Sequence, residues 1–224
     1  MQPEETIINL ATSTKSISDN DCHFYLGTTH DFSHRYDELY KTLDAVEKQK
    51  ANSFKFEKDK KLYVIAHGIL RELIGSYFNC NPSSINFINN DSGKPHIANS
   101  LKVSDLQFSL SHSVDCFVIA FNLDEPIGAD VERIVPGTDH SVIIENYFSV
   151  SEKEQLGKTT NKDKFFYQLW TEKEAIGKVS GTGVTNIPNL QLQEGYKLYN
   201  GSLNNYQYAI CYPGNKEVKI LPLS

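Results

Sequence analysis

The sequence predicts an α+β fold in which helices are followed by strands, once in each half of the chain. The observations are a long amphipathic helix at residues 60–78, strand-like segments between residues 106 and 131, and a second succession of helices and strands from residue 151 onward. A pair of similar α+β halves fits this order, although the order alone does not establish it and no internal repeat is visible.

The chain is predicted to begin with a polar extension. Residues 1–20 are rich in Ser, Thr, Asp and Asn, so we expect them to be loosely held, with one short strand at 6–10. A strand is then expected at 23–27 and a charged helix at 43–56. The folded part of the chain should therefore begin shortly after residue 20.

The helix predicted at 60–78 has the clearest pattern of the first half. Its apolar residues recur at three- and four-residue spacing, which places them on one face; they are Leu62, Ile65, Ile69, Leu73 and Tyr77. Asn81-Pro82 should end the helix, because a residue before proline avoids helical angles. A strand at 85–88 and a loop at 89–95 are expected next.

Strands dominate the middle of the chain. We expect them at 106–110, 116–122 and 127–131, with a tight connection at 124–126 between the last two. A segment of mixed character follows at 134–148.

Two helices and three strands are predicted for the rest of the chain. Ser151 and Glu154 match a capping box, so one helix should begin at Ser151. A second helix is expected at 163–179, and Gly181 should help to end it. The remaining strands are predicted near the ranges 190–193, 206–212 and 218–221.

Composition and charge indicate a soluble globular protein. The chain has 224 residues, of which 39% are hydrophobic and 22% charged, so it can bury a sizeable core. The net charge of −6 argues against nucleic-acid binding, which usually requires a basic face. A local basic pocket for a phosphorylated ligand remains compatible with this charge. The length of the chain fits either one large domain or two small, closely joined halves.

The cysteines and the apolar segments favour a cytoplasmic location. The four cysteines show no Cys-x-x-Cys spacing, so neither a zinc site nor a redox motif is predicted. Scattered cysteines in a chain of this size fit a reducing cytosol. We expect no signal peptide, and no apolar run approaches the roughly 20 residues that would span a bilayer.

Asp130 and Glu132 lie in the segment Gly-Ala-Asp-Val-Glu of a predicted strand. Alternate strand residues project to one side, so the two carboxylates should lie together. Close carboxylates repel one another unless a cation neutralises them, and their hard oxygen atoms suit Mg²⁺. A strand with ordinary surface acids is the alternative, and this pentapeptide alone does not exclude it.

Trp170, Glu174 and Lys178 share one face of the helix predicted at 163–179, because they recur at four-residue spacing. Glu174 could complete the acidic site, and Lys178 could reach a phosphate. A glutamate followed four residues later by a lysine is also the commonest surface pair on helices. Taken alone, the helix favours this second interpretation.

Ser92-Gly93-Lys94-Pro95-His96 forms a predicted loop. A Gly-Lys pair in a loop can bring an ammonium group and backbone N–H groups to a phosphate. The segment lacks the glycine spacing of a P-loop, which argues against a nucleoside triphosphatase. A simple surface turn fits the segment about equally well.

Ser111-His112 follows the strand predicted at 106–110. Adjacent strand residues face opposite ways, so this pair is poorly placed as nucleophile and base, and no Gly-x-Ser-x-Gly motif is present. His112 is a better candidate for a contact to phosphate. A buried histidine that hydrogen-bonds within the core is the alternative.

Taken in order, Gly-Lys-Pro, Ser-His-Ser, Gly-x-Asp-x-Glu and Trp-x-x-Lys-Glu-Ala resemble the motifs of the Sfp-type 4′-phosphopantetheinyl transferases. The resemblance runs from about Gly93 to Lys178, and more loosely across most of the chain. Phe148 and Glu152 also look like a short motif of that family.

The resemblance implies a fold of two similar α+β halves with the active site in the cleft between them. On this basis residues 1–20 are an extension and residues 21–114 are the N-terminal half. Residues 115–224 are the C-terminal half, which carries the acidic metal site.

The resemblance also implies a reaction. Members of this family transfer the 4′-phosphopantetheine group of coenzyme A to a serine of an apo acyl or peptidyl carrier protein, which becomes holo, and adenosine 3′,5′-bisphosphate is released. Asp130, Glu132 and Glu174 match the ligands of Mg²⁺, and Glu174 or a water that it holds would be the base. Lys178 would stabilise the pyrophosphate and the leaving group. Residues that match contacts to coenzyme A are Lys50, Lys94, Pro95, Ser111, His112 and Lys173.

The contact to the 3′-phosphate of coenzyme A is left open by the resemblance. Many relatives have an arginine near the position of Leu62, whereas here Lys60 and Lys61 flank that position and Lys50 lies upstream. Any of the three lysines could act.

The carrier protein is expected to dock beside the cleft. The segment 134–148 directly follows the acidic strand and is rich in apolar residues, which suits helix-in-groove recognition. The same side chains could instead fill the core. By analogy with the family we expect a monomer of secondary metabolism that binds neither nucleic acid nor a membrane.

Two other functions compete with the transferase. A non-catalytic module that binds coenzyme A or a nucleotide would keep Lys94 and His112 but would not need the three acids. A Mg²⁺-dependent phosphohydrolase acting on coenzyme A would normally carry a denser acidic cluster than this sequence shows.

Overall fold

The computed structural model describes residues 16–89, 95–98, 106–181 and 190–223. The first part of the chain contains these elements: β1 (Asp21–Thr28), η1 (Ser33–Arg35), α1 (Tyr36–Thr42), α2 (Ala45–Ser53), α3 (Glu57–Phe78), η2 (Pro82–Ser84), β2 (Phe87–Asn89), β3 (Pro95–Ile97) and β4 (Leu106–Ser113). The second part contains β5 (Cys116–Leu123), β6 (Gly128–Arg133), α4 (Ser141–Tyr147), α5 (Val150–Lys158), α6 (Lys162–Ser180), β7 (Tyr196–Leu203), β8 (Tyr206–Pro213) and β9 (Glu217–Leu221). These elements form the predicted α+β fold.

The strands form two larger sheets and one short hairpin. One sheet has the order β4-β5-β1-β9, the other has the order β6-β8-β7, and β2 pairs with β3. β1 pairs with β9 in parallel, whereas the other strand pairs are antiparallel. β9 thus joins the far end of the described chain to its first strand.

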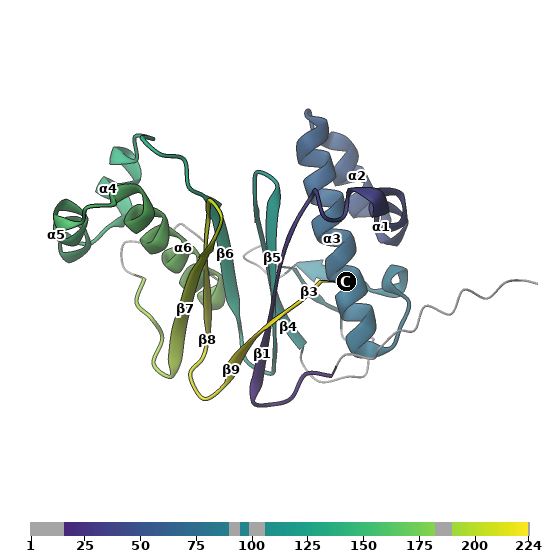
Figure 1. Ribbon diagram of the computed structural model, residues 1–224. Helices are drawn as coiled ribbons and strands as arrows, with labels where there is room; N and C mark the ends of the chain where they lie inside the picture. Colours follow the sequence, from purple (N-terminus) through teal and green to yellow (C-terminus); the bar gives the residue numbers. More distant parts are fainter. Residues whose placement is uncertain (1–15, 90–94, 99–105, 182–189, 224) are drawn as a thin grey trace, which may run out of the picture.

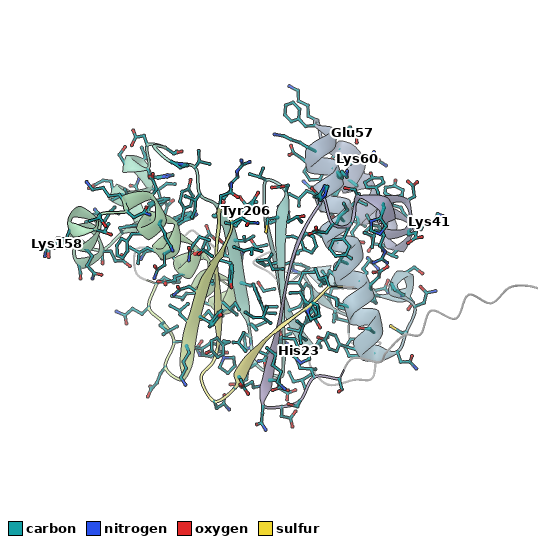
Figure 2. All side chains as sticks on the ribbon, viewed as in Figure 1. His23, Lys41, Glu57, Lys60, Lys158 and Tyr206 are labelled. Atoms are coloured by element: carbon teal, nitrogen blue, oxygen red, sulfur yellow. The ribbon has the colours of Figure 1, made fainter. Side chains whose placement is uncertain are left out.

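The elements are arranged as helices, sheet, sheet, helices. Figure 1 shows α1, α2 and α3 on one side of the strands and α4, α5 and α6 on the other. Figure 2 places the labelled Glu57 and Lys60 at the start of α3 and Lys158 at the end of α5, on opposite sides of the molecule. His23 and Tyr206 lie on the strands between them.

Alternation along the strands explains the two cores around the first sheet. In β5, Phe117, Ile119 and Phe121 belong to the core beneath α3. Val118 and Ala120 belong to the core between the two sheets. Side chains of a strand point alternately to its two faces, so a strand covered on both sides reads as one continuous apolar run.

Most of the predicted elements are confirmed, with shifted ends. α3 is the helix predicted at 60–78, and α6 is the helix predicted at 163–179. The strand predicted at 106–110 continues as β4 through Ser113. The short strand predicted at 6–10 lies outside the described residues.

Two predictions for the second half are wrong. The capping box belongs to Ser149 and Glu152, so the N-cap of α5 lies two residues before the predicted Ser151 and the helix itself begins at Val150. Residues 190–193 form no strand, and β7 lies further on at Tyr196–Leu203. Ser149-Val-Ser151-Glu152-Lys-Glu154 contains two overlapping capping boxes, and the helix uses the first of them.

The predicted division after residue 114 falls between two strands of one sheet. β4 and β5 pair along their whole length across the turn at Val114 and Asp115. The two predicted halves therefore share one sheet. Of the helices in the described part of the chain, none combines the length and the hydropathy needed to cross a membrane.

Candidate active site

A cavity of about 720 Å³ lies beside β4. Its walls are formed by α2, α3, the β2–β3 hairpin, β4 and the C-terminal part of α6. Several residues predicted to bind a ligand line it, namely Lys50, Pro95, Ser111, His112 and Lys178. Lys94 was also predicted to bind a ligand, but it lies outside the described residues.

Alternate serines of β4 connect it to β6. The Ser109 hydroxyl accepts a hydrogen bond from the Ala129 backbone N–H at 3.0 Å. The Ser111 hydroxyl donates to Asp130 Oδ1 at 2.7 Å, and the Ser113 hydroxyl donates to Glu132 Oε2 at 2.7 Å. The serines of Phe-Ser-Leu-Ser-His-Ser thus hold the two acidic side chains of β6 next to the cavity wall.

Gly128 lets α6 lie directly on β6. A methyl group at this position would overlap the backbone carbonyl of Ala175, so only glycine fits between the two elements. This close approach brings Glu174 and Lys178, which flank Ala175 on α6, over the acidic strand. The spacing Gly-x-Asp-x-Glu therefore has a structural reason as well as a chemical one.

Lys178 connects α6 to Asp130. Its Nζ donates to Asp130 Oδ1 at 2.8 Å and to the Ala129 carbonyl oxygen at 2.9 Å. Asp130 is only 4% exposed, and no described residue hydrogen-bonds its Oδ2 atom. Lys178 of α6 therefore pairs with an acid of β6. This contact differs from the surface pair with Glu174 that the spacing within the helix also allowed.

Burial and the charges of neighbouring carboxylates shift the pKa values of Glu174 and Glu132. Burial, and then the charges of Asp130 and Glu132, raise the pKa of Glu174 to about 7, although Lys178 opposes this. Burial also raises the pKa of Glu132, while the hydrogen bond from Ser113 opposes the shift. The three acids predicted to bind metal thus lie close enough for their charges to interact.

The chemistry of these side chains fits Mg²⁺. Within the described ranges, no three His, Cys, Asp or Glu side chains cluster tightly enough to enclose a metal ion by themselves. Mg²⁺ commonly keeps several waters and is held by one or two carboxylates together with the phosphates of a substrate. Asp130 has a buried oxygen atom that is available for such a contact.

Lys173 lies apart from the cavity. Its ammonium forms an ion pair with Glu152 Oε1 at 2.8 Å and lies 5.7 Å from the centroid of the Phe148 ring. Because Glu152 also completes the capping box of α5, this lysine fixes α5 against α6. Lys173 is thus not among the residues brought together at the cavity, although its neighbour Glu174 is close to Asp130.

A polar cluster on the opposite wall of the cavity was not predicted from the sequence. Arg71 of α3 is fully buried and hydrogen-bonds Glu47 and Asp44 of the α2 region. Glu47 in turn contacts Nδ1 of His67 at 3.1 Å, and His67 stacks on Tyr63 with 3.9 Å between ring centroids. The sequence signal was present, because Arg71 interrupts the buried residues of α3 and follows His67 by one helical turn.

Comparisons with known proteins cover both parts of the chain. Residues 30–123 match a sequence family described as 4′-phosphopantetheinyl transferase, N-terminal, and residues 126–211 match the 4′-phosphopantetheinyl transferase superfamily. The chain belongs to the 4′-phosphopantetheinyl transferase superfamily. This result confirms the resemblance to Sfp-type enzymes and the α+β fold that the resemblance implies.

Individual relatives have names from the same superfamily. The chain is 31% identical to the 4′-phosphopantetheinyl transferase HetI of Nostoc sp. over 157 residues, which cover 69% of this chain and 66% of HetI. It is 29% identical to Sfp of Bacillus subtilis over 62% of this chain and 60% of Sfp. It is 28% identical to AcpT of Escherichia coli over 55% of this chain and 64% of AcpT. In each case the chain spans less than two thirds of the relative's length.

The segment 134–148, which was predicted to dock a carrier protein, contains both core residues and exposed apolar residues. Ile143, Ile144 and Phe148 pack in a core with α5 and α6. Val135 and Val142 are exposed, by 47% and 71%. The segment therefore offers some apolar surface, as expected for either of the two roles considered from the sequence.

Proposed function

We propose that this protein transfers the 4′-phosphopantetheine group of coenzyme A to a serine hydroxyl of an apo acyl or peptidyl carrier protein. The products are the holo carrier and adenosine 3′,5′-bisphosphate. The observation that carries the proposal is the partly buried cluster of Asp130, Glu132, Glu174 and Lys178 beside a 720 Å³ cavity, in a chain of this superfamily.

The cavity suits a ligand that has several phosphates. Lys50, His112 and Lys178 line it, and the side chain of Ser111 also reaches it. Lys50 and Lys178 carry positive charges, and His112 adds a ring N–H that can hydrogen-bond phosphate oxygen atoms. The Ser111 hydroxyl already donates its one hydrogen to Asp130 and serves to orient that carboxylate. These contacts would orient the pyrophosphate of coenzyme A next to the acidic strand.

Glu174 is the proposed base. A raised pKa of about 7 lets a carboxylate accept a proton near neutral pH. In the proposed reaction, the serine oxygen of the carrier forms a bond to the pantetheine-side phosphorus while its proton passes to Glu174 or to a water held there. The bond from that phosphorus to the oxygen that bridges to the adenosine side breaks, and Lys178 stabilises the charge on the departing phosphate.

Asp130, Glu132 and Glu174 would hold the magnesium ion in the proposed site. When bound, Mg²⁺ would neutralise the charge that grows on the phosphates during transfer. The hydrogen bonds from Ser111 and Ser113 orient two of these carboxylates before any ligand arrives. Such orientation lowers the cost of assembling the site.

Mass spectrometry of an apo carrier protein tests the proposal. The carrier is incubated with this protein, coenzyme A and Mg²⁺, and its mass is measured before and after. A gain equal to one phosphopantetheine group supports transfer, and chelation of the metal should prevent that gain. An unchanged carrier with intact coenzyme A would point to a binding module, and an unchanged carrier with hydrolysed coenzyme A would point to a phosphohydrolase.

A further inference from the structure

The turn between β4 and β5 holds a valine in a conformation that valine rarely adopts. Ser113 pairs with Cys116, so Val114 and Asp115 form a two-residue loop. The φ angle of Val114 is 60°, whereas Asp115 has a negative φ. Two-residue hairpins of this kind normally have glycine at the first loop position, and a branched side chain makes a positive φ still less favourable. The turn is therefore strained at Val114.

Hydrogen bonds on both sides of the strained valine hold the turn in place. The Ser113 hydroxyl donates to Glu132 Oε2 at 2.7 Å. The carbonyl oxygen of Asp115 accepts from the backbone N–H of Thr29 at 2.7 Å, and its carboxylate accepts from the hydroxyl of Tyr206. A strained residue persists where its surroundings fix the conformation, and these contacts do so from two directions.

Packing within the fold does not account for a valine at this position. The side chain of Val114 is 46% exposed, and it belongs to none of the apolar cores formed by the described residues. The residue therefore strains the backbone without a compensating contact in the core. Strained conformations concentrate at functional sites, so the reason for this side chain should lie on the surface that it faces.

Val114 lies next to the acidic cluster and outside the cavity. The preceding residue, Ser113, hydrogen-bonds Glu132, whereas the part of β4 that lines the cavity ends at His112. Figure 1 shows the turn at the upper end of the strands, between the two layers of helices, and Figure 2 places Tyr206 at the same end. In the proposed reaction coenzyme A occupies the cavity, so a second substrate that reaches the acids from solvent passes this turn.

The apolar surface at the turn continues onto the next strand. The backbone N–H of Arg133 donates to the Ser113 hydroxyl at 3.2 Å, so the ends of β4 and β6 lie side by side. β6 leads directly into the segment 134–148, in which Val135 is 47% exposed. Val114 therefore extends, from a different sheet, the surface that is expected to contact the carrier protein.

We infer that Val114 is a specificity-determining residue that contacts the apo carrier protein beside its acceptor serine. The inference rests on the proposed function for the identity of the partner. Because the turn is anchored and valine is stiff about χ1, little conformational entropy is lost when the carrier covers this side chain. A carrier with an apolar residue next to its serine should therefore be a better substrate than one with a polar residue there.

Steady-state kinetics with an apo acyl carrier protein and an apo peptidyl carrier domain test this inference, together with calorimetric binding of coenzyme A. Val114→Gly should raise the KM for the carrier about fivefold, the effect of exposing about half of one valine side chain. The kcat and the dissociation constant of coenzyme A should not change. The melting temperature should rise by about 2–4 °C, because relief of the positive φ outweighs the greater freedom of glycine in the unfolded chain.

Three further variants separate the contact to the carrier from the strain of the turn. Val114→Thr keeps the branched shape and the strain but replaces a methyl group by a hydroxyl, so the KM should rise without a gain in melting temperature. Val114→Ile keeps an apolar branched side chain and should leave both quantities at the wild-type values. Asp124→Gly is the matched control, because Asp124 has a φ of 68° in the connection at the other end of β5. It should raise the melting temperature without changing the KM.

Several outcomes would overturn the role of Val114 alone. One is an unchanged KM in Val114→Gly and Val114→Thr while the wild-type protein modifies the carrier. Another is weaker binding of coenzyme A in these variants, because Val114 would then contact that ligand instead. A wild-type dimer that dissociates in Val114→Gly, measured by light scattering, would assign the surface to a second copy of this chain.

Binding of a carrier whose serine is replaced by alanine separates this inference from the proposed function. If the wild-type protein binds this carrier but modifies no intact one, and Val114→Gly binds it about fivefold more weakly, the role of Val114 is supported and the transferase is not. If the wild-type protein neither binds nor modifies a carrier, both are overturned.

Discussion

Gly128→Ala is the substitution that most directly tests how the active site is assembled. β6 carries Asp130 and Glu132, α6 carries Glu174 and Lys178, and the two elements meet at this glycine. An added methyl group would overlap the carbonyl oxygen of Ala175. Since that oxygen belongs to the backbone of a helix, no change of side-chain rotamer can relieve the overlap.

The expected loss of stability follows from this geometry. Overpacking in a close-packed core costs about 1–3 kcal/mol, and a clash with backbone should lie near the upper end. For a chain of this length, each kcal/mol lowers the melting temperature by about 2–4 °C. We therefore expect Gly128→Ala to melt about 6–12 °C below the wild-type protein.

Thermal unfolding followed by circular dichroism, together with the carrier modification assay, measures both consequences. Gly157→Ala is the matched control, because Gly157 lies on α5 and no atom would lie within 4 Å of an added Cβ. That variant should gain about 0.5–1 kcal/mol, as alanine is favoured over glycine within a helix. Carrier modification should decrease in Gly128→Ala, because α6 must move away from β6, and should be unchanged in Gly157→Ala.

This account of the site would be refuted if Gly128→Ala had the same melting temperature as the wild-type protein and modified the carrier at the same rate. The same conclusion would follow if both glycine variants changed equally. Loss of activity without loss of stability would mean that α6 shifts at little cost in free energy. That result would refute the predicted drop in melting temperature but not the close contact of α6 with β6 at Gly128.

Further predictions concern single side chains. Asp130→Asn should abolish carrier modification with the fold retained in circular dichroism, and full activity would refute the metal assignment. Lys178→Met should slow transfer by about 10²-fold, as when a donor to developing charge is removed, and an unchanged rate in the same assay would refute its role. Arg71→Met leaves buried Glu47 without its cation and should cost about 3–5 kcal/mol in urea unfolding, so a loss below about 1 kcal/mol would count against a structural role for the pair of Arg71 and Glu47. Burial raises the pKa of Glu47, but the hydrogen bond to His67 and the charge of Arg71 outweigh burial and lower this pKa below its usual 4.5. The wild type should therefore lose stability on acidification below about pH 4.5. Glu47→Gln, which has no carboxylate at this position, should lose less stability over the same pH range.

The order of elements could be predicted because most of them carry local patterns. α3 has an apolar stripe, and β5 is a continuous apolar run that only a strand covered on both faces would bury. β7 has no such pattern, because it is an edge strand with mostly exposed residues. The pairing of β1 with β9 involves residues far apart in the chain, and no local signal reports it.

The site was only partly predictable for a similar reason. Asp130 and Glu132 could be singled out because alternate acids of a strand project to one side. Glu174 was assigned only through the resemblance to the transferase family, since its spacing to Lys178 is also that of a surface pair. The ion pair of Lys178 with Asp130 depends on α6 lying against β6, which the spacing within α6 does not reveal. Arg71 and Glu47 are separated by 24 residues, so their contact appears only in the folded chain.

The parallel pair of β1 and β9 also bears on how the chain folds as it is made. Lys219 of β9 reaches back across 198 residues to pair with Asp21 of β1 at 2.7 Å. β9 must therefore leave the ribosome before the first sheet can gain its last strand, and until then one edge of β1 is open to other strands. Nascent chains halted between β8 and β9 should consequently be more prone to aggregation than chains in which β9 has been made.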